Sequence, residues 1–312
     1  MIKKFNIFFD VGLAAKRLSA SLLPHLLVRR TIDVRLRAHS EDALHPDIFR
    51  QAWLLGAICL IFIVGCAPGM KPVALKDMPA VQEVSAVIAS GATLPEHEKL
   101  VYQVKWLGIT AGEIIAEIKG RVMWRGRSCY LIEVTARTTG FVSSMYKVDD
   151  LYRSYFDAER FYSVRHEEHR HEGAYHKDAV TDFDHGAGKA HFVNAADNTS
   201  KIFDIPSGVQ DTITASYAVR LLPLAPGKSF AFKVSNSEKV YDLLATITTR
   251  SQMMHRGHVY DVLHLIPFAK IRGEEVREGR ASGFFTDDAR KIPLVVVIKA
   301  PVFTQVTATL VE

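Results

Sequence analysis

Between residue 98 and residue 312, several segments carry apolar side chains at every second position, and this pattern constrains the fold more than any other feature. A side-chain period of two is that of a β-strand with one buried face. The pattern is clearest in residues 100–106, 114–118, 130–136, 241–247 and 306–310. These segments favour antiparallel pairing, because the connections between neighbouring segments are short. No long helical segments alternate with them, so a doubly wound α/β fold is excluded.

One helix is predicted within this β region, at about residues 211–221. Asp211 is a suitable N-cap, and Tyr217 and Leu221 follow at helical spacing on one side of the helix. Thr214 stands where a glutamate would complete a capping box, so the start of the helix is only half specified.

We therefore predict an all-β domain over residues 96–312, built as an antiparallel, strongly curved sheet or half-barrel with the helix against its concave side. The alternating residues form a broad apolar face, whereas one short helix covers only a narrow stripe, so the sheet has to curve to bury the rest. The alternative is a β-sandwich, in which two sheets bury the same residues against each other. A half-barrel leaves room for an apolar cavity, and a filled sandwich does not.

A second feature lies before the strands and concerns location. Residues 52–64 are almost entirely apolar, and the run ends at Ile63, Val64, Gly65 and Cys66. A membrane-spanning helix needs about 20 apolar residues, whereas a shorter run closed by small residues is typical of an export signal. The four residues resemble the lipobox of bacterial lipoproteins. This resemblance implies lipidation of Cys66 and removal of everything before it.

The sequence thus predicts three parts. Residues 1–65 form a leader with a type II signal peptide, in which residues 1–40 are either a start-site artefact or part of an unusually long leader. Residues 66–95 form a proline-punctuated tether with a weak helix at about 81–89, and residues 96–312 form a single β domain.

The expected location is the periplasmic face of the outer membrane, with Cys66 as the membrane anchor. Ala67 follows the cysteine, whereas an aspartate there favours inner-membrane retention in well-studied lipoproteins, which this segment resembles. The outer leaflet of the inner membrane is the alternative.

The charge of the chain argues against a nucleic-acid partner. The net charge is +5, from 39 basic and 34 acidic residues. Nine of the basic and five of the acidic residues precede Cys66, so the remainder is almost neutral. No basic patch is left to bind a phosphate backbone. No pattern indicates a cofactor either, and Cys129 lies in an alternating run where a cysteine is typical of the core.

Four segments carry a more specific signal: WLGITAG at 106–112, YKVDD at 146–150, DTITASY at 211–217 and DDARKIP at 287–293. In this order they resemble the bacterial envelope family catalogued as domain of unknown function 3108, and the resemblance extends over about residues 94–312. It implies a β fold and an envelope location, but it lends no catalytic residues.

The same segments have a structural interpretation. Gly108 and Gly112 suit a tight turn and a bulge or close backbone approach. Residues 287–293 are typical of a turn between two strands, in which an aspartate accepts hydrogen bonds from the backbone.

Trp106, Tyr217 and Leu221 are the candidate ligand-binding residues, because they are expected to face the concave side. The first hypothesis for function is a binding module for a lipid or another apolar envelope molecule, in a half-barrel that resembles the lipoprotein-localisation carriers by architecture alone. The second is a structural or scaffolding lipoprotein that contacts other envelope proteins through its sheet edges.

A hydrolase is a remote third alternative. Asp149, Asp150 and Asp157 could form an acid–base set, but carboxylates make a site only in a cleft that perturbs their pKa values. We therefore expect no enzymatic activity.

The histidines at 166–191 raise the question of a metal site. With a hairpin turn at Glu172 and Gly173, His169 would pair with His176, and His169, His171 and His176 would project from one face, close enough to share a metal ion. The alternative is a solvated hairpin, since both faces of these strands are polar.

Overall fold

The computed structural model describes residues 81–88, 93–271, 274–275, 280–300 and 304–312. The described residues all lie within one compact unit of the chain. The predicted leader and the lipobox with Cys66 and Ala67 lie outside the described residues. None of the helices in the described ranges is long and apolar enough to cross a membrane.

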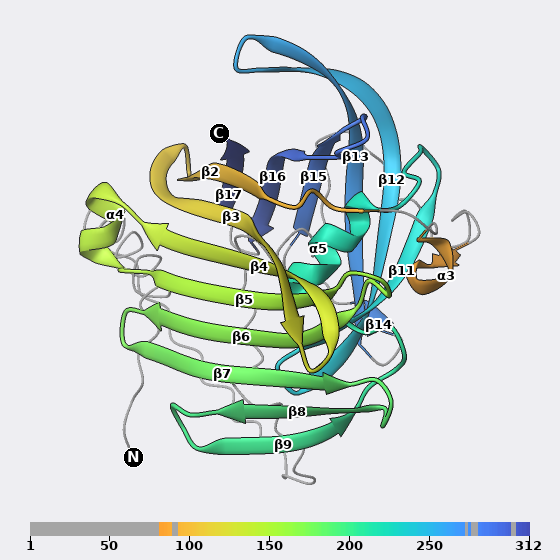
Figure 1. Ribbon diagram of the computed structural model, residues 1–312. Coiled ribbons are helices and arrows are strands. Elements are labelled where there is room, and N and C mark those ends of the chain that lie inside the picture. Colours follow the sequence, from red (N-terminus) through yellow and green to blue (C-terminus); the bar gives the residue numbers. More distant parts are fainter. Residues whose placement is uncertain (1–80, 89–92, 272–273, 276–279, 301–303) are drawn as a thin grey trace, which may run out of the picture. The chain divides into compact units, whose positions relative to one another are not determined.

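Strands dominate the described chain and form one 17-stranded sheet, which is antiparallel except for β1 and β10 (Figure 1). The strands are β1 (Val81–Glu83), β2 (Glu98–Trp106), β3 (Ile109–Trp124), β4 (Arg127–Thr138), β5 (Asp149–Asp157), β6 (Ser163–Glu172), β7 (Tyr175–Asp184), β8 (Lys189–Asn194), β9 (Thr199–Asp204), β10 (Gln210–Asp211), β11 (Ser229–Asn236), β12 (Lys239–His255), β13 (His258–Ile271), β14 (Glu274–Glu275), β15 (Arg280–Thr286), β16 (Pro293–Ala300) and β17 (Thr304–Leu310).

Hairpin follows hairpin along the sheet, and the two ends of the β domain meet where β17 pairs with β2. The helices in the described ranges are α3 (Val84–Val87), α4 (Gly140–Met145) and α5 (Thr212–Arg220). The sheet curves around α5, and we call the face that α5 packs against the inner face (Figure 1). The prediction of an all-β, curved antiparallel sheet with a helix at about 211–221 is confirmed, and the sandwich alternative is wrong, because the described strands form one sheet.

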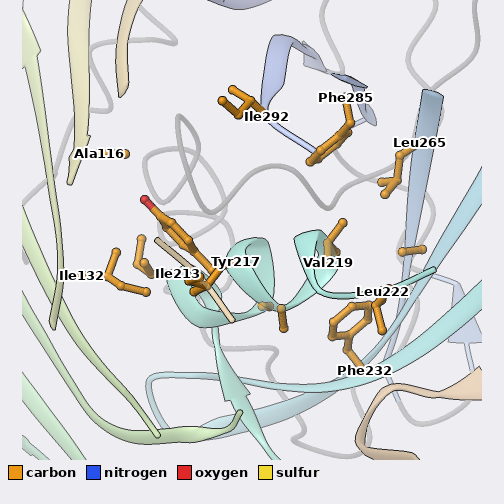
Figure 2. Close-up of a cluster of buried hydrophobic side chains, with 14 of the residues drawn as sticks. Ala116, Ile132, Ile213, Tyr217, Val219, Leu222, Phe232, Leu265, Phe285 and Ile292 are labelled. Carbon is orange, nitrogen blue, oxygen red and sulfur yellow. The ribbon is translucent and has the colours of Figure 1, made fainter. Parts of the chain in front are cut away.

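The main hydrophobic core lies between the inner face and α5. Side chains from α5 and the chain just after it meet residues of β4, β11 and β13, as Figure 2 shows for Tyr217 and Ile132 and for Leu222 and Phe232. Most residues with the predicted inward alternation belong to this core: Leu100, Tyr102, Tyr130, Ile132, Val134, Phe230, Phe232, Leu243 and Ile247. Trp106 and Tyr241 are half-buried and lie outside it.

The start of the domain lies earlier than the sequence pattern indicates. β1 pairs in parallel with β11, and Val84 of α3 is buried in the main core. Part of the predicted tether therefore belongs to the folded domain. The four-residue helix α3 falls within the weak helix predicted at about 81–89.

The glycine pattern of the first signature segment is explained by the backbone. Gly108 adopts a φ of +83° in the turn between β2 and β3. A Cβ atom on Gly112 would lie 2.3 Å from the carbonyl oxygen of Arg137, so only glycine allows β4 to approach this closely. The predicted close backbone approach is confirmed.

The start of α5 differs from the prediction in one respect, because its capping box is complete. Asp211 is the N-cap, as predicted, and its side chain accepts from the backbone N–H groups of Ile213 and Thr214. Thr214 nevertheless completes the capping box, because its hydroxyl oxygen accepts from the backbone N–H of Asp211 at 3.0 Å. A threonine hydroxyl thus replaces the expected glutamate carboxylate at a fully buried position, where a charge would need further partners.

Replacing Thr214 with valine tests this capping box. Thr214→Val keeps the shape and removes the hydroxyl, so we expect the free energy of unfolding to fall by about 1 kcal/mol in urea denaturation. The matched control is Thr212→Val in the same helical turn, which is expected to change it by less than about 0.5 kcal/mol. Equal losses in the two variants would contradict the role of the Thr214 hydroxyl.

Candidate functional site

The N-terminus of α5 is fastened to the inner face by one buried carboxylate. Oδ1 of Asp211 accepts from the backbone N–H groups of Ile213 and Thr214 at 2.7 and 2.9 Å, and from the Ser154 hydroxyl at 3.0 Å. Oδ2 accepts from the Ser163 hydroxyl at 2.8 Å. Because Ser154 lies on β5 and Ser163 on β6, Asp211 joins two strands to the helix.

The C-terminus of α5 is fastened by Arg220. Its guanidinium donates to the two carboxylate oxygens of Glu98 at 2.6 and 2.7 Å and to the carbonyl oxygen of Arg290 at 3.0 Å. Burial opposes the charge of Arg220, but hydrogen bonding and attraction to Glu98 raise the pKa of Arg220 above its ordinary value. The helix is therefore held to the start of β2 and to the turn between β15 and β16.

That turn is the signature segment at 287–293, and its predicted structure is confirmed. Asp288 accepts from the backbone N–H groups of Arg290 and Lys291 at 2.9 and 3.0 Å and from the Thr286 hydroxyl at 2.8 Å. These bonds hold the backbone of Arg290 where it receives Arg220.

A serine, a histidine and an aspartate meet at the start of α5, a grouping that the sequence analysis did not identify. Oγ of Ser154 lies 2.9 Å from Nδ1 of His166 and 3.0 Å from Oδ1 of Asp211, and the same His166 nitrogen lies 3.6 Å from that oxygen. In a catalytic triad the acid binds the histidine nitrogen that faces away from the serine. Here serine and aspartate share one nitrogen, all three side chains are buried, and the carboxylate caps the helix. This group of three side chains therefore holds the start of α5 in place and does not have the arrangement of a catalytic triad.

A cluster of buried charges lies beside this group on β5 and β6. Arg170 donates to Oε1 of Glu172 from Nε at 2.9 Å and from Nη2 at 2.5 Å, and its Nε lies 3.9 Å from Oδ2 of Asp150. Asp150 also accepts from the Tyr152 hydroxyl at 3.2 Å and the backbone N–H of His171 at 2.9 Å. The side chains of Arg170, Glu172 and Asp150 have almost no exposed surface.

The two carboxyl groups of this cluster compete for a proton. Burial raises the pKa of Glu172 to about 8; the Arg170 guanidinium opposes the rise and the charge of Asp150 adds to it. Burial also raises the pKa of Asp150, although a hydrogen bond from Glu172 and the charge of Arg170 favour its ionised form. At neutral pH the carboxyl of Glu172 therefore keeps its proton.

A second buried ion pair joins β6 to β7. Nζ of Lys177 donates to both carboxylate oxygens of Glu168 at 2.8 and 2.9 Å and to the hydroxyl of Ser237 at 2.7 Å. Attraction to Lys177 is the main reason that the pKa of Glu168 is lowered despite its burial. Lys177 is thus fully occupied by partners.

The three aspartates considered as an acid–base set do not come together. Asp149 and Asp157 are the first and last residues of β5, and only Asp150 joins the buried cluster. Asp149 pairs with Arg137 at 2.8 Å at the surface, and Asp157 pairs with Arg127 at 3.2 Å. They form no common site.

The candidate ligand-binding residues separate into two places. Tyr217 belongs to the main core, and Leu221 is partly buried and packs against it. Trp106 is the last residue of β2 and lies outside this core. The hydroxyl of Tyr217 is buried and has no hydrogen-bond partner among the described residues, and burial raises its pKa. Tyr130, Ile132 and Val219 have 0% exposed surface, so no water-sized void touches them. Tyr217 itself is 4% exposed, and Ile132, which lies beside it in Figure 2, is 0% exposed, so little free volume adjoins this ring.

Trp106 adjoins an exposed apolar surface, which we call the apolar rim. It consists of Leu107 and Ile109 at the β2–β3 turn and Phe141 and Met145 on α4, with exposed fractions of 56%, 57%, 72% and 49%. α4 lies beside the β2–β3 turn in Figure 1, and the backbone N–H of residue 139 donates to the carbonyl of residue 111 at 3.0 Å. The sequence pattern does not predict α4, because α4 buries none of its residues and has no side-chain cap.

The histidine hairpin has a different register from the predicted one. His171, not His169, pairs with His176, and His169 pairs with Asp178, because the turn lies at Gly173 and Ala174. The three histidines share the outer face, but Nδ1 of His169 contacts Asp178 at 2.8 Å. In the part of the chain that the structure describes, no group of three or more His, Cys, Asp or Glu residues is placed to hold a metal ion. The geometry does not assemble the predicted site.

A pocket of about 180 Å³ lies at the strand ends opposite the apolar rim, and it was also absent from the sequence analysis. Its lining comes from three turns: Arg125, Arg127, Tyr162, Val164, Phe183, Asp184 and His185. The ring of His185 stacks on that of Tyr162 at a centroid distance of 3.6 Å. Both arginines are already paired, Arg125 with Asp182 at 3.3 Å and Arg127 with Asp157 at 3.2 Å, so the pocket has no free positive charge to select an anion.

The fold and these contacts define a class of protein: a single curved β-sheet with one helix fastened to its inner face at both ends. The chain belongs to the family described as protein of unknown function (DUF3108), which matches residues 101–311. The family resemblance seen in the sequence is thereby confirmed. No curated protein matches the chain.

The solved structures that match the chain include the following two. One is a β-barrel-like protein of domain of unknown function DUF1849 from Brucella abortus, with a TM-score of 0.50 and 10% sequence identity over 70% of this chain and 97% of that one. This likeness supports the fold alone. The other is a protein with a YmcC-like fold from Bacteroides fragilis, with a TM-score of 0.27 and 7% identity over 70% and 96% of the two chains, a likeness too slight to support an argument.

The proton on Glu172 predicts a dependence of stability on pH. An unfolded glutamate loses its proton near pH 4.3, whereas the folded one keeps it to about pH 8. Between these values the folded state binds more protons, so the Glu172 contribution to stability falls by roughly 1.4 kcal/mol per pH unit as the pH rises. From pH 5 to pH 8 we expect the stability of Glu172→Gln to rise relative to that of the wild type by on the order of 4 kcal/mol.

Urea denaturation at pH 5, 6.5 and 8 measures this difference, and Glu159→Gln on an exposed turn is the control. If the difference in stability between the wild type and Glu172→Gln stays constant over this range, Glu172 is ionised in the folded protein.

Proposed function

We propose that this protein is an envelope lipoprotein, anchored to the outer membrane through Cys66, whose β domain binds lipid through the apolar rim. The main support for this proposal is the exposure of α4. A helix normally buries one face, but α4 buries none of its residues, and Phe141 and Met145 point away from the core. Clustered apolar side chains in water mark a site of contact with a membrane or another molecule.

The chemistry around the rim favours a lipid bilayer as the partner. Trp106 is half-buried beside the rim, and Lys105 and Lys147, which are close to rim residues in the sequence, are exposed. Tryptophan and lysine are suited to the boundary between lipid and water, because each combines an apolar body with a polar tip. Full burial of one large apolar side chain contributes about 1.5–3 kcal/mol, so four partly exposed ones supply a useful addition to an acyl anchor.

The distance from the anchor to the rim also permits this contact. The predicted anchor at Cys66 precedes β1 by about 15 residues, which reach roughly 50 Å when extended. β2 places its last residue, Trp106, about 26 Å from its first, at a rise of roughly 3.3 Å per residue. The chain before β1 is therefore long enough for the rim to meet the surface that holds the anchor.

A lipid enclosed in the interior is the second candidate. The unpartnered hydroxyl of Tyr217 favours it, because a bound polar head would satisfy that donor. Against it stands the close packing of the core, which requires α5 to move before an acyl chain can enter. Asp211 and Arg220 oppose that movement. The proposal assigns no catalytic step, because the Ser154–His166–Asp211 group is buried and engaged in holding α5.

Lipidation is tested by Cys66→Ala. The thiol is the attachment point for the acyl-glyceryl group, so we expect the variant to remain uncleaved or to be released from the membrane. The measurement is the mass of the protein together with density-gradient fractionation of membranes. A variant that is processed and membrane-bound like the wild type would refute lipidation, and wild-type protein in the inner-membrane fraction would refute the outer-membrane location.

The rim is tested on the mature chain from residue 66 with Cys66→Ser, so that no acyl chain contributes. In co-sedimentation with phosphatidylethanolamine–phosphatidylglycerol vesicles, we expect Phe141→Ser with Met145→Ser to weaken binding about tenfold or more. The control pair, Ile202→Ser with Met254→Ser, removes similar side chains that are 66% and 68% exposed elsewhere.

Equal binding by the two pairs would exclude the rim as the lipid-binding surface. Saturable binding of a soluble fluorescent fatty acid, unchanged in the rim variant, would favour the interior site instead. If the protein binds neither the vesicles nor the fatty acid, the scaffolding alternative remains.

A further inference from the structure

The β12–β13 hairpin extends well beyond the strands that flank it. β11 ends its pairing with β12 at Thr246, and β15 begins its pairing with β13 at Val262. β12 and β13 nevertheless stay paired as far as His255 and His258. Residues 248–261 are therefore a two-stranded ribbon at the tip of the hairpin, seen as the long arch in Figure 1. We call it the terminal ribbon.

One face of the terminal ribbon carries three side chains that bind soft metal ions. His255 lies directly opposite His258, and Met253 lies directly opposite Tyr260. Opposite residues of an antiparallel pair project from the same face, as do residues two apart on one strand. Met253, His255, His258 and Tyr260 therefore share a face.

The turn places the two histidines directly opposite each other across the hairpin. Arg256 and Gly257 link the strands with φ angles of +49° and +81°, the left-handed conformation of a two-residue hairpin turn. Directly opposite Cβ atoms are about 4.5–5.5 Å apart, a separation at which two histidines can ligate one ion. Met253 lies two residues before His255 on the same face of β12, so its thioether can approach an ion held between the two histidines.

His255 is the least ordinary member of the group. It is only 8% exposed, although it ends a strand at a hairpin tip, and its Nε2 is buried with no hydrogen-bond partner among the described residues. The ring of Tyr260 contacts both imidazoles, with centroid distances of 6.1 Å to His255 and 6.5 Å to His258. A buried imidazole nitrogen without a partner is costly, and a metal ion would supply the missing partner.

We propose that Met253, His255 and His258 form a binding site for Cu(I). A thioether sulfur is a soft ligand that selects Cu(I), and imidazole nitrogen also suits copper. Magnesium, calcium and manganese prefer carboxylate oxygens, and the nearest acid of the ribbon, Asp261, lies on the opposite face beside Gln252. Three neutral ligands at a hairpin tip bind a monovalent soft ion without the cost of burying an anion.

Methionine offers a matched test. Met253 and Met254 are neighbours on opposite faces of the ribbon, and Met254 is 68% exposed and outside the proposed site. The full-length chain is titrated without oxygen against a chromogenic Cu(I) chelator. Met253→Leu is expected to lower the Cu(I) affinity about tenfold or more and His255→Ala further, because each removes a direct ligand. Met254→Leu is expected to leave it unchanged. All variants retain the same cysteines.

A second measurement guards against loss of folding in the histidine variant. In the wild type labelled with ¹³C at the methionine methyl groups, Cu(I) is expected to shift the Met253 resonance and to leave that of Met254 in place. Equal affinities of Met253→Leu and Met254→Leu, or an unshifted Met253 methyl, would overturn the site. Zn²⁺ binding tighter than that of Cu(I) and indifferent to Met253→Leu would overturn the choice of metal.

Discussion

The carboxylate of Asp211 is the interaction on which the arrangement of sheet and helix depends. A nine-residue helix is marginal alone in water, and its first N–H groups would be costly inside an apolar core. Asp211 satisfies two of them and also accepts from hydroxyls on β5 and β6. A buried carboxylate would be destabilising without partners, but four donors surround this one, so the cap and the attachment of the helix come from the same group.

Fastening α5 at both ends has a consequence for function. The bidentate pair of Arg220 with Glu98 holds the C-terminal end as Asp211 holds the other, so α5 fills the concave side of the sheet. The groups with the chemistry most often found in active sites are engaged in this attachment. What remains available for contact lies at the margins of the sheet, on the apolar rim and the terminal ribbon. Function in such a domain is therefore expected at strand ends, where the fold tolerates variation.

The sequence predicted those parts of the fold that rest on apolar periodicity or on a local cap. Alternation located the strands and most of the core, and Asp211 located the helix. It did not predict α4, which has neither a buried face nor a cap, or the burial of Glu168 and Arg170. β6 is polar on both faces, so alternation cannot tell which face turns inward; only the neighbouring strands and α5 decide that. The rim and the ribbon were missed because both depend on pairings between strands.

Buried charges on β6 and β7 take over a task that apolar side chains perform elsewhere in the sheet. Register in a strand is normally fixed because a slip by one residue moves the apolar set to the wrong face. In β6 such a slip would bring His169 inward, expose Arg170 and separate Lys177 from Glu168. An unpaired buried charge costs several kcal/mol, so the paired register is strongly preferred even without apolar alternation. The ion pairs thus determine register more than they add stability, and the outer histidines are left at the surface by the same choice.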